Sequence, residues 1–148
     1  PPPPPPPPPA QDLPEERWEE RDITMLEGCW DLESDYRLQD VRTGEIATVR
    51  SWRMCFDESG RGRQELELTN GARCSGETTA EFRPDGSLRL QDQGDVPCRR
   101  GDRQGSFRIF ERRMSCQRVD GEHADCESSQ AETGSTSNVR FRRSRENP

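Results

Sequence analysis

Turn sequences recur along the chain from residue 26 onward and divide it into short segments. The turns read RTGE (42–45), DESGRG (57–62), TNGA (69–72), RPDGS (83–87) and VDGE (119–122). Asn-Gly and Asp-Gly pairs supply the positive φ angles that tight β-hairpins need. The chain is therefore expected to fold as a series of antiparallel strands joined by hairpin turns.

Between these turns, apolar and polar side chains alternate, so that every second residue lies on one side of a strand. Such alternation predicts about eight strands, at 28–38, 45–56, 61–68, 72–82, 87–92, 105–117, 122–130 and 138–143. A meander of this size buries its apolar side most readily by closing on itself, which also removes exposed strand edges. The predicted fold class is a small all-β antiparallel meander barrel, with an open sandwich of the same strands as the alternative.

The chain is poor in the side chains that build a hydrophobic core. Only 27% of its residues are hydrophobic and 34% are charged, a composition close to that of chains that do not fold. It has six cysteines and no CxxC pair. Small domains outside the cytosol often replace missing core with disulfides worth about 2–4 kcal/mol each. We therefore expect a disulfide-stabilised barrel.

Hairpin geometry favours one pairing of the cysteines. Residues opposite each other in an antiparallel pair lie about equally far from the turn that joins their strands. Three sequential pairs meet this condition within a few residues: Cys29 with Cys55, Cys74 with Cys98, and Cys116 with Cys126. Sequential pairing is thus favoured among the 15 pairings open to six cysteines, while reduced cysteines buried as small hydrophobic residues are the alternative.

The N-terminal region is expected to differ from the barrel. Pro1 to Pro9 predicts a polyproline II spacer, with a ligand for proline-binding domains as the less favoured interpretation. The following acidic stretch predicts a short helix after Pro14 whose Trp18 docks on the barrel. We divide the chain into a linker (1–25), one barrel domain (26–145) and a tail (146–148). Because it starts within a proline tract, we expect it to be the C-terminal part of a longer protein.

Charge and hydropathy exclude some partners. The net charge of −7 argues against nucleic acid and anionic membrane surfaces as partners. No apolar run reaches the roughly 18 residues that a membrane-spanning helix needs. All basic residues are arginines, which excludes lysine chemistry within this segment.

The start of the first predicted strand is similar to the Gly-x-Trp signature of lipocalin-like (calycin) barrels. Gly28 and Trp30 stand in Leu-Glu-Gly-Cys-Trp. The resemblance implies that the tryptophan closes one end of the barrel and that an arginine of the last strand lies across its ring. The last strand reads NVRFRRSR, so Arg140, Arg142 or Arg143 would supply that cation–π contact.

A wider resemblance rests on the phrases LEGCWDLESDYRL, TGE, MCFDESGRGR, ARCSG and VPC. They resemble the C-terminal domain of SrfA-family bacterial virulence-factor proteins, in which a proline-rich linker leads to a small β domain. The resemblance implies a protein of the Gram-negative envelope, periplasmic or extracellular. It implies no activity and no catalytic residues.

The sequence holds few candidates for chemistry. The single histidine, His123, lies in a predicted hairpin, and with Cys116 and Cys126 it would give three zinc ligands where four are needed. Four acids, Asp57, Glu58, Asp92 and Asp95, are predicted in solvated turns. Two arginine clusters are candidates for an anionic saccharide or lipid headgroup, although a solvated strand face is favoured: Arg99, Arg100 and Arg103, and Arg140, Arg142, Arg143 and Arg145. We expect no catalytic residue, cofactor or metal.

These observations predict a non-catalytic envelope domain that binds or contacts a partner, either an envelope protein, a glycan or a small apolar ligand. One alternative is a lipocalin-like carrier of a lipid or glycan, because an eight-strand barrel can hold one small ligand. Its interior would be lined by Trp52, Met54, Phe56, Leu66, Leu68 and Phe82. A less favoured alternative is a cell-wall hydrolase. An interior filled by these side chains would exclude ligand carriage.

Overall fold

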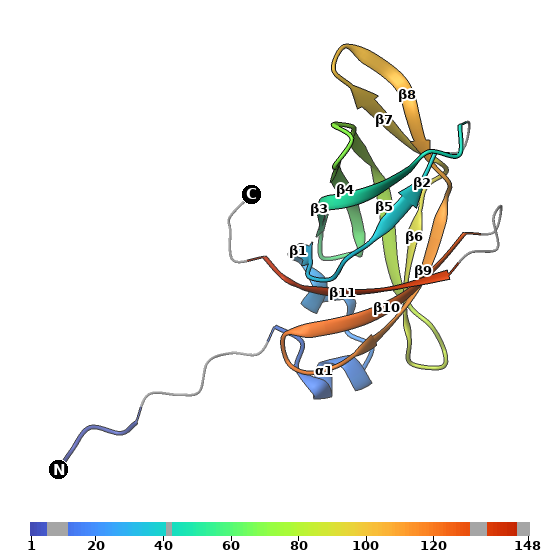
Figure 1. Ribbon diagram of the computed structural model, residues 1–148. Coiled ribbons are helices and arrows are strands. Elements are labelled where there is room, and N and C mark those ends of the chain that lie inside the picture. Colours follow the sequence, from blue (N-terminus) through green and yellow to red (C-terminus); the bar gives the residue numbers. More distant parts are fainter. Residues whose placement is uncertain (6–11, 41–42, 131–135, 145–148) are drawn as a thin grey trace.

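The computed structural model is an all-β molecule with short helical turns near its N-terminus (Figure 1). It describes residues 1–5, 12–40, 43–130 and 136–144, and only the backbone of 104–107. The helical elements are α1 (Glu15–Glu19) and the 3₁₀ helix η1 (Ile23–Leu26). The strands are β1 (Gly28–Leu32), β2 (Arg37–Gln39), β3 (Ile46–Phe56), β4 (Arg61–Leu68), β5 (Arg73–Phe82), β6 (Leu88–Asp92), β7 (Val96–Arg100), β8 (Arg103–Ile109), β9 (Arg112–Arg118), β10 (His123–Gln130) and β11 (Thr136–Arg143).

Eight strands close into an antiparallel barrel. The ring runs β3, β1, β11, β10, β9, β6, β5 and β4, and β4 pairs again with β3. Apart from the closing pair of β1 with β11, neighbours in the ring follow one another along the chain or are joined through the short β2 and β7–β8 segments. The predicted closed meander is therefore confirmed, and the sandwich alternative is wrong.

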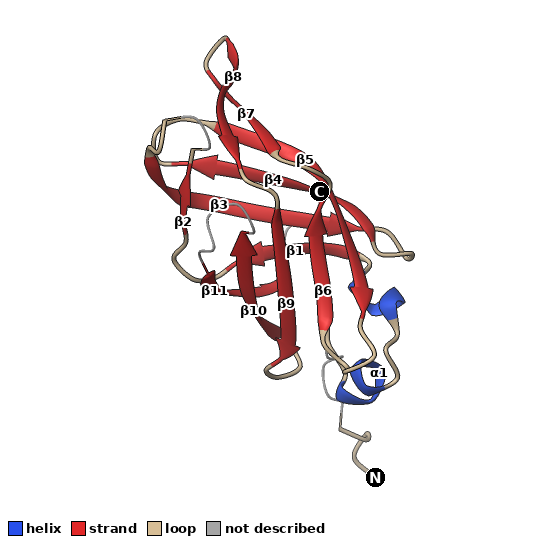
Figure 2. Ribbon diagram, turned by 90° about the vertical axis from the view of Figure 1, so that its right-hand side faces the viewer, coloured by secondary structure: helices blue, strands red, loops and turns tan. Residues whose placement is uncertain are grey.

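Two predicted strands are interrupted. The first predicted strand consists of β1 and β2, which both pair with β3 at different positions. After β6 the chain turns at 93–95, where Gly94 has a φ of 83°, and resumes as β7 beside the start of β5. The hairpin of β7 and β8 extends beyond the end of the barrel opposite α1 (Figures 1 and 2). The prediction ended the fifth strand at residue 92, where β6 ends, but it missed β7 and ran the sixth strand through the break between β8 and β9 at 110–111. It also did not separate β1 from β2.

All six cysteines form the predicted sequential disulfides. Cys29 bonds Cys55, Cys74 bonds Cys98, and Cys116 bonds Cys126. The two members of each pair are directly opposite in register on neighbouring strands. Two of these disulfides, 74–98 and 116–126, are almost completely buried. Sulfur therefore occupies core positions that apolar side chains would fill in a richer sequence.

The folded part begins earlier than the predicted domain boundary at residue 26. Leu13 and Trp18 are buried, and Trp18 packs edge-on against Phe82 with ring centroids 5.1 Å apart. The backbone N–H of Leu13 donates to Gly121 O at 2.7 Å, and Arg118 Nε donates to Leu13 O at 2.7 Å. The predicted short helix and its docked tryptophan are both present. The segment from residue 12 to 26 thus covers one end of the barrel.

Two predictions at the chain ends stay predictions. Residues 6–9 of the proline tract and the tail at 146–148 lie outside the described residues. No helix in the part that the structure describes is long and apolar enough to cross a membrane.

We expect replacement of Cys29 and Cys55 by alanine to lower the free energy of unfolding by about 3 kcal/mol, because the cross-link restricts the unfolded chain. Urea denaturation without reductant measures the loss. Dithiothreitol should then destabilise the variant less than the wild type, which has one more bond to lose. Equal midpoints for variant and wild type would contradict a stabilising role for this disulfide.

Candidate functional site

Trp30 and Arg143 close the end of the barrel that the N-terminal segment covers. Trp30 is buried, and its indole Nε1 donates to Leu26 O at 2.9 Å. The guanidinium of Arg143 lies 4.4 Å from the centre of the Trp30 ring. Arg143 also donates to Glu27 O and Met25 O, each at 2.6 Å. This single arginine therefore ties the last strand to the covering segment.

Arg143 is the one of the three candidate arginines that caps Trp30. Arg140 instead pairs with Asp125 at 2.6 Å, and Arg142 lies 3.4 Å from Glu33. Assigning Arg140 and Arg142 to barrel closure was thus wrong. Their side chains point outward, because residues on either side of Phe141 face away from the interior.

The glycine of the Gly-x-Trp pattern has a steric role. Gly28 has a φ of 113°, which side-chain-bearing residues rarely adopt, and a Cβ there would collide with the Arg143 guanidinium. Partial burial lowers the pKa of Arg143 below its ordinary value, and the carboxylate of Asp12, 3.1 Å from Arg143 Nε, opposes that effect. The Gly-x-Trp pattern therefore makes room for the arginine that covers the tryptophan.

Apolar side chains fill the half of the interior next to this cap. The predicted lining residues Trp52, Met54, Phe56, Leu66 and Leu68 are all buried in the core. The apolar cavity beside Met54, Phe56 and Trp30 measures about 30 Å³, roughly the volume of one water in the liquid. Phe82, the sixth predicted lining residue, is only partly buried and packs against Trp18 at the covered end.

A polar network lies in the barrel core beside Trp52. Arg112 and Asp92, with 0% and 1% of their side chains exposed, form an ion pair at 2.8 Å. Gln64 joins them, because its Oε1 accepts from Arg112 at 2.6 Å and its Nε2 donates to Asp92 at 2.5 Å. Trp52 Nε1 donates to the same Gln64 oxygen at 3.1 Å. Polar side chains thus link β3, β4, β6 and β9 across the core.

The electrostatics of this network favour a permanent ion pair. Burial opposes the charge on Arg112, but the interactions with Asp92 and Tyr36 together outweigh it, so the pKa of the guanidinium lies above its ordinary value. The guanidinium also lies 4.5 Å from the Trp52 ring centre. Tyr36 stacks on Trp52 with ring centres 5.3 Å apart, and its hydroxyl is 3.2 Å from that of Ser128. These groups contact one another in the core, and Nη1 of Arg112 is buried without a hydrogen-bond partner among the described residues.

The interpretation of Asp92 as a solvated turn residue was wrong. Asp92 follows Leu88 and Leu90 at inward spacing, and Arg112 precedes Met114 and Cys116 at the same spacing. Because Leu90 is opposite Met114 in register, continuing that register brings Asp92 opposite Arg112. An acid and an arginine at inward positions of paired strands were the signal that could have revealed the network.

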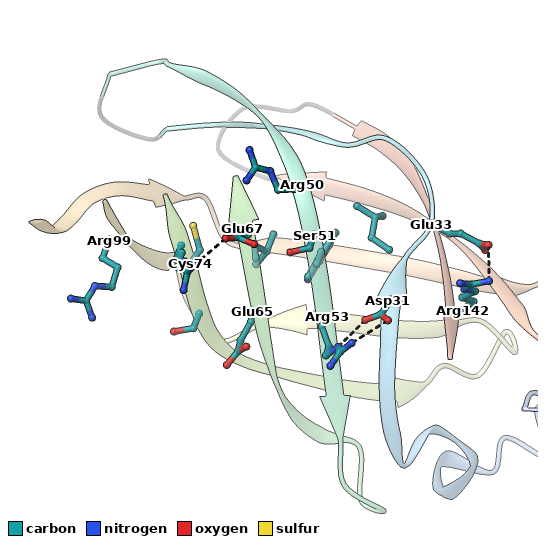
Figure 3. Close-up of a pocket in the computed structure, with 15 residues that line it drawn as sticks. Asp31, Glu33, Arg50, Ser51, Arg53, Glu65, Glu67, Cys74, Arg99 and Arg142 are labelled. Carbon is teal, nitrogen blue, oxygen red and sulfur yellow. Dashed lines mark hydrogen bonds and ion pairs between the residues drawn. The ribbon is translucent and has the colours of Figure 1, made fainter. Parts of the chain in front are cut away.

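A much larger hollow than the apolar cavity lies on the outer surface. It measures about 760 Å³ and runs over β1, β3, β4 and β5 (Figure 3). Its side chains form ion pairs between neighbouring strands: Arg53 with Asp31 at 2.9 Å, and Arg73 with Glu67 at 3.2 Å. We call this feature the outer hollow. Its lining comprises Asp31, Leu32, Glu33, Arg50, Ser51, Trp52, Arg53, Glu65, Leu66, Glu67, Arg73, Cys74, Ser75, Arg99 and Arg142.

His123 belongs to a surface charge network. Its ring nitrogens lie 2.9 Å from Asp120 and 2.9 Å from Glu33. A backbone hydrogen bond from Glu122 and the contact with His123 lower the pKa of Asp120. Cys116 and Cys126, the other zinc candidates, are bonded to each other. Within the described ranges, no group of three or more His, Cys, Asp or Glu side chains is arranged to hold a metal.

The two predicted arginine clusters are dispersed. Arg100 pairs with Glu45 at 2.7 Å, whereas Arg99 lines the outer hollow. Arg103 begins β8 and is exposed at the tip of the projecting hairpin. Arg145 lies outside the described residues. Neither cluster therefore forms one continuous basic patch.

The sequence matches no protein-family model and no curated protein. Among solved structures, it is similar to a de novo designed fluorescence-activating β-barrel, with a TM-score of 0.50 and 13% sequence identity. The match covers 83% of this chain and 98% of the designed one. At this identity, the likeness supports the barrel fold alone.

We expect Arg112 and Asp92 to be strongly coupled. Arg112→Met alone should cost about 3–5 kcal/mol of stability, because it leaves the Asp92 carboxylate buried without its partner. Adding Asp92→Leu should recover part of that loss, with a coupling of about 1–3 kcal/mol. Urea denaturation of both single variants and the double variant measures the cycle. Additive effects would contradict the pairing.

Arg143→Gln should destabilise the barrel by about 1–3 kcal/mol, because it removes the contact with Trp30 and hydrogen bonds to two carbonyl groups. Arg142→Gln is the matched control, since Arg142 makes only a long surface ion pair that contributes little. Thermal unfolding followed by tryptophan fluorescence compares the two. A larger loss in the Arg142 variant would refute the assignment of the cap.

Proposed function

We propose that this chain is a non-catalytic recognition domain that contacts its partner with the outer surface of the barrel. The observation that carries the proposal is the filled interior. Among the described residues, the apolar cavity beside the cap measures about 30 Å³, and the Arg112 network is buried in the core. Pockets for small organic ligands usually measure about 300–1,000 Å³, so this cavity is too small for a carried lipid or glycan.

The proposed location is outside the cytoplasm. Three disulfides in a chain this poor in apolar residues are consistent with an oxidising compartment. The finer part of the proposal is that the chain belongs to the SrfA-like proteins of the Gram-negative envelope, where the proline tract acts as a spacer. Its support is the set of sequence phrases around Gly28 and Trp30 and the proline run before them.

The outer surface has both the space and the polar groups to bind a partner. The outer hollow is open to solvent and combines guanidinium, carboxylate and hydroxyl groups. Its strongest ion pairs join residues on neighbouring strands, so these side chains are held in position by a rigid, cross-linked wall. Rigid, pre-positioned groups bind a partner with a smaller entropic cost than mobile ones.

An apolar fluorescent probe tests surface recognition against ligand carriage. Titration of the protein with 1-anilinonaphthalene-8-sulfonate or a fluorescent fatty acid should show no saturable binding, because the interior is occupied. Unfolded or acid-treated protein is the positive control for probe fluorescence. Stoichiometric binding of the fatty acid with micromolar affinity to the native protein would overturn the proposal and restore the carrier function.

A further inference from the structure

We propose that the outer hollow is a binding site for an acidic saccharide, meaning a sugar chain that carries carboxylate groups. The inference deepens the recognition function proposed above and rests on it. It rests on the ion pairs within the hollow, on the arginines outside these pairs, and on the strand register that places them side by side.

Charged side chains lie in two rows across the hollow, and each row follows the register of neighbouring strands. The first row holds Glu65, Arg53, Asp31 and Arg142, which are direct partners in register from β4 through β3 and β1 to β11. The second row holds Arg99, Arg73 and Glu67, which are partners from β7 through β5 to β4. Opposite charges alternate along the first row, whereas two arginines stand side by side in the second.

The ion pairs leave the second row with positive charge in excess. Glu67 is the acid bonded to Arg73, at 3.2 Å, and Arg73 is 74% exposed. Arg99 and Arg50 are exposed and form no ion pair with any residue that the structure describes. Arg50 stands at the bulge where the register between β3 and β4 shifts. The guanidinium groups of Arg50, Arg73 and Arg99 thus outnumber the one carboxylate paired with them, that of Glu67. This positive group lies on a protein whose net charge is −7.

Guanidinium groups present planar pairs of N–H donors that match a carboxylate. Free arginines at one end of a hollow therefore favour a ligand that carries carboxylates. The hollow also holds acceptors and hydroxyls, namely the unpaired Glu65 carboxylate and the side chains of Ser51 and Ser75. These groups fit a ligand with many hydroxyl donors.

A chain of uronic acids satisfies both requirements. A uronic acid chain offers carboxylates to the arginines and ring hydroxyls to the carboxylates and serines. A densely charged polyanion would instead be repelled by Asp31, Glu33, Glu65 and Glu67 in the same hollow. The volume of about 760 Å³ lies within the usual range of ligand pockets, about 300–1,000 Å³.

The test uses a hexamer of galacturonic acid and isothermal titration calorimetry on the whole chain. We expect the double variant Arg50→Gln with Arg99→Gln to bind the hexamer at least tenfold more weakly than wild type. Arg113→Gln is the matched control, because Arg113 is an exposed arginine on β9, on the opposite side of the ring. It should bind within about twofold of wild type. The methyl-esterified hexamer, which lacks free carboxylates, should not bind.

Three results would overturn the inference. They are no binding of the hexamer at millimolar concentration, an equal loss of affinity in Arg113→Gln, and tighter binding of inorganic polyphosphate than of the hexamer. Circular dichroism of each variant confirms that the barrel is intact. The recognition function itself is judged by the apolar probe, so a failure of saccharide binding leaves that result standing.

Discussion

Disulfides between directly opposite residues let a chain with 27% hydrophobic side chains close an eight-strand barrel. Each bond restricts the unfolded chain and so offsets part of the conformational entropy that a small core cannot. Two of the three disulfides are almost completely buried, so the same sulfur atoms also fill space. Each bond also fixes the register between the two strands that it joins.

The interior of the barrel is mostly apolar, and Trp30 with Arg143 seals the end next to the N-terminal cover. Beside Trp52, Arg112, Asp92 and Gln64 form a buried polar network, in which Nη1 of Arg112 has no hydrogen-bond partner among the described residues. A buried ion pair contributes less stability than well-packed apolar residues do, but breaking it is costly. It therefore favours one register of the strands around it, and leaves no space for a ligand.

Because the apolar cavity inside the barrel is too small for a ligand, the outer surface is the candidate for binding a partner. There, charged side chains of opposite sign lie in rows across neighbouring strands. Many of them line the outer hollow over β1, β3, β4 and β5 (Figure 3). The lipocalin-like closure and the proposed mode of recognition are thus separate features. The first uses Gly28, Trp30 and Arg143 to hold the barrel shut, whereas the second uses arginines that the barrel presents to solvent.

The sequence by itself determined most of the strands, their meander order, the closed barrel and the disulfide partners, because turn residues and period-two alternation are local signals. Its resemblance to lipocalin-like barrels implied that an arginine of the last strand covers Trp30. Only the tertiary structure decided that this arginine is Arg143, that Asp92 is buried against Arg112, and that residues 12–26 cover the barrel. The outer hollow belongs to this second group, because its side chains come from strands far apart in the sequence. Such contacts depend on which strands become neighbours and where each one bends, and no local pattern indicated β7 or the break at 110–111 strongly enough for either to be predicted.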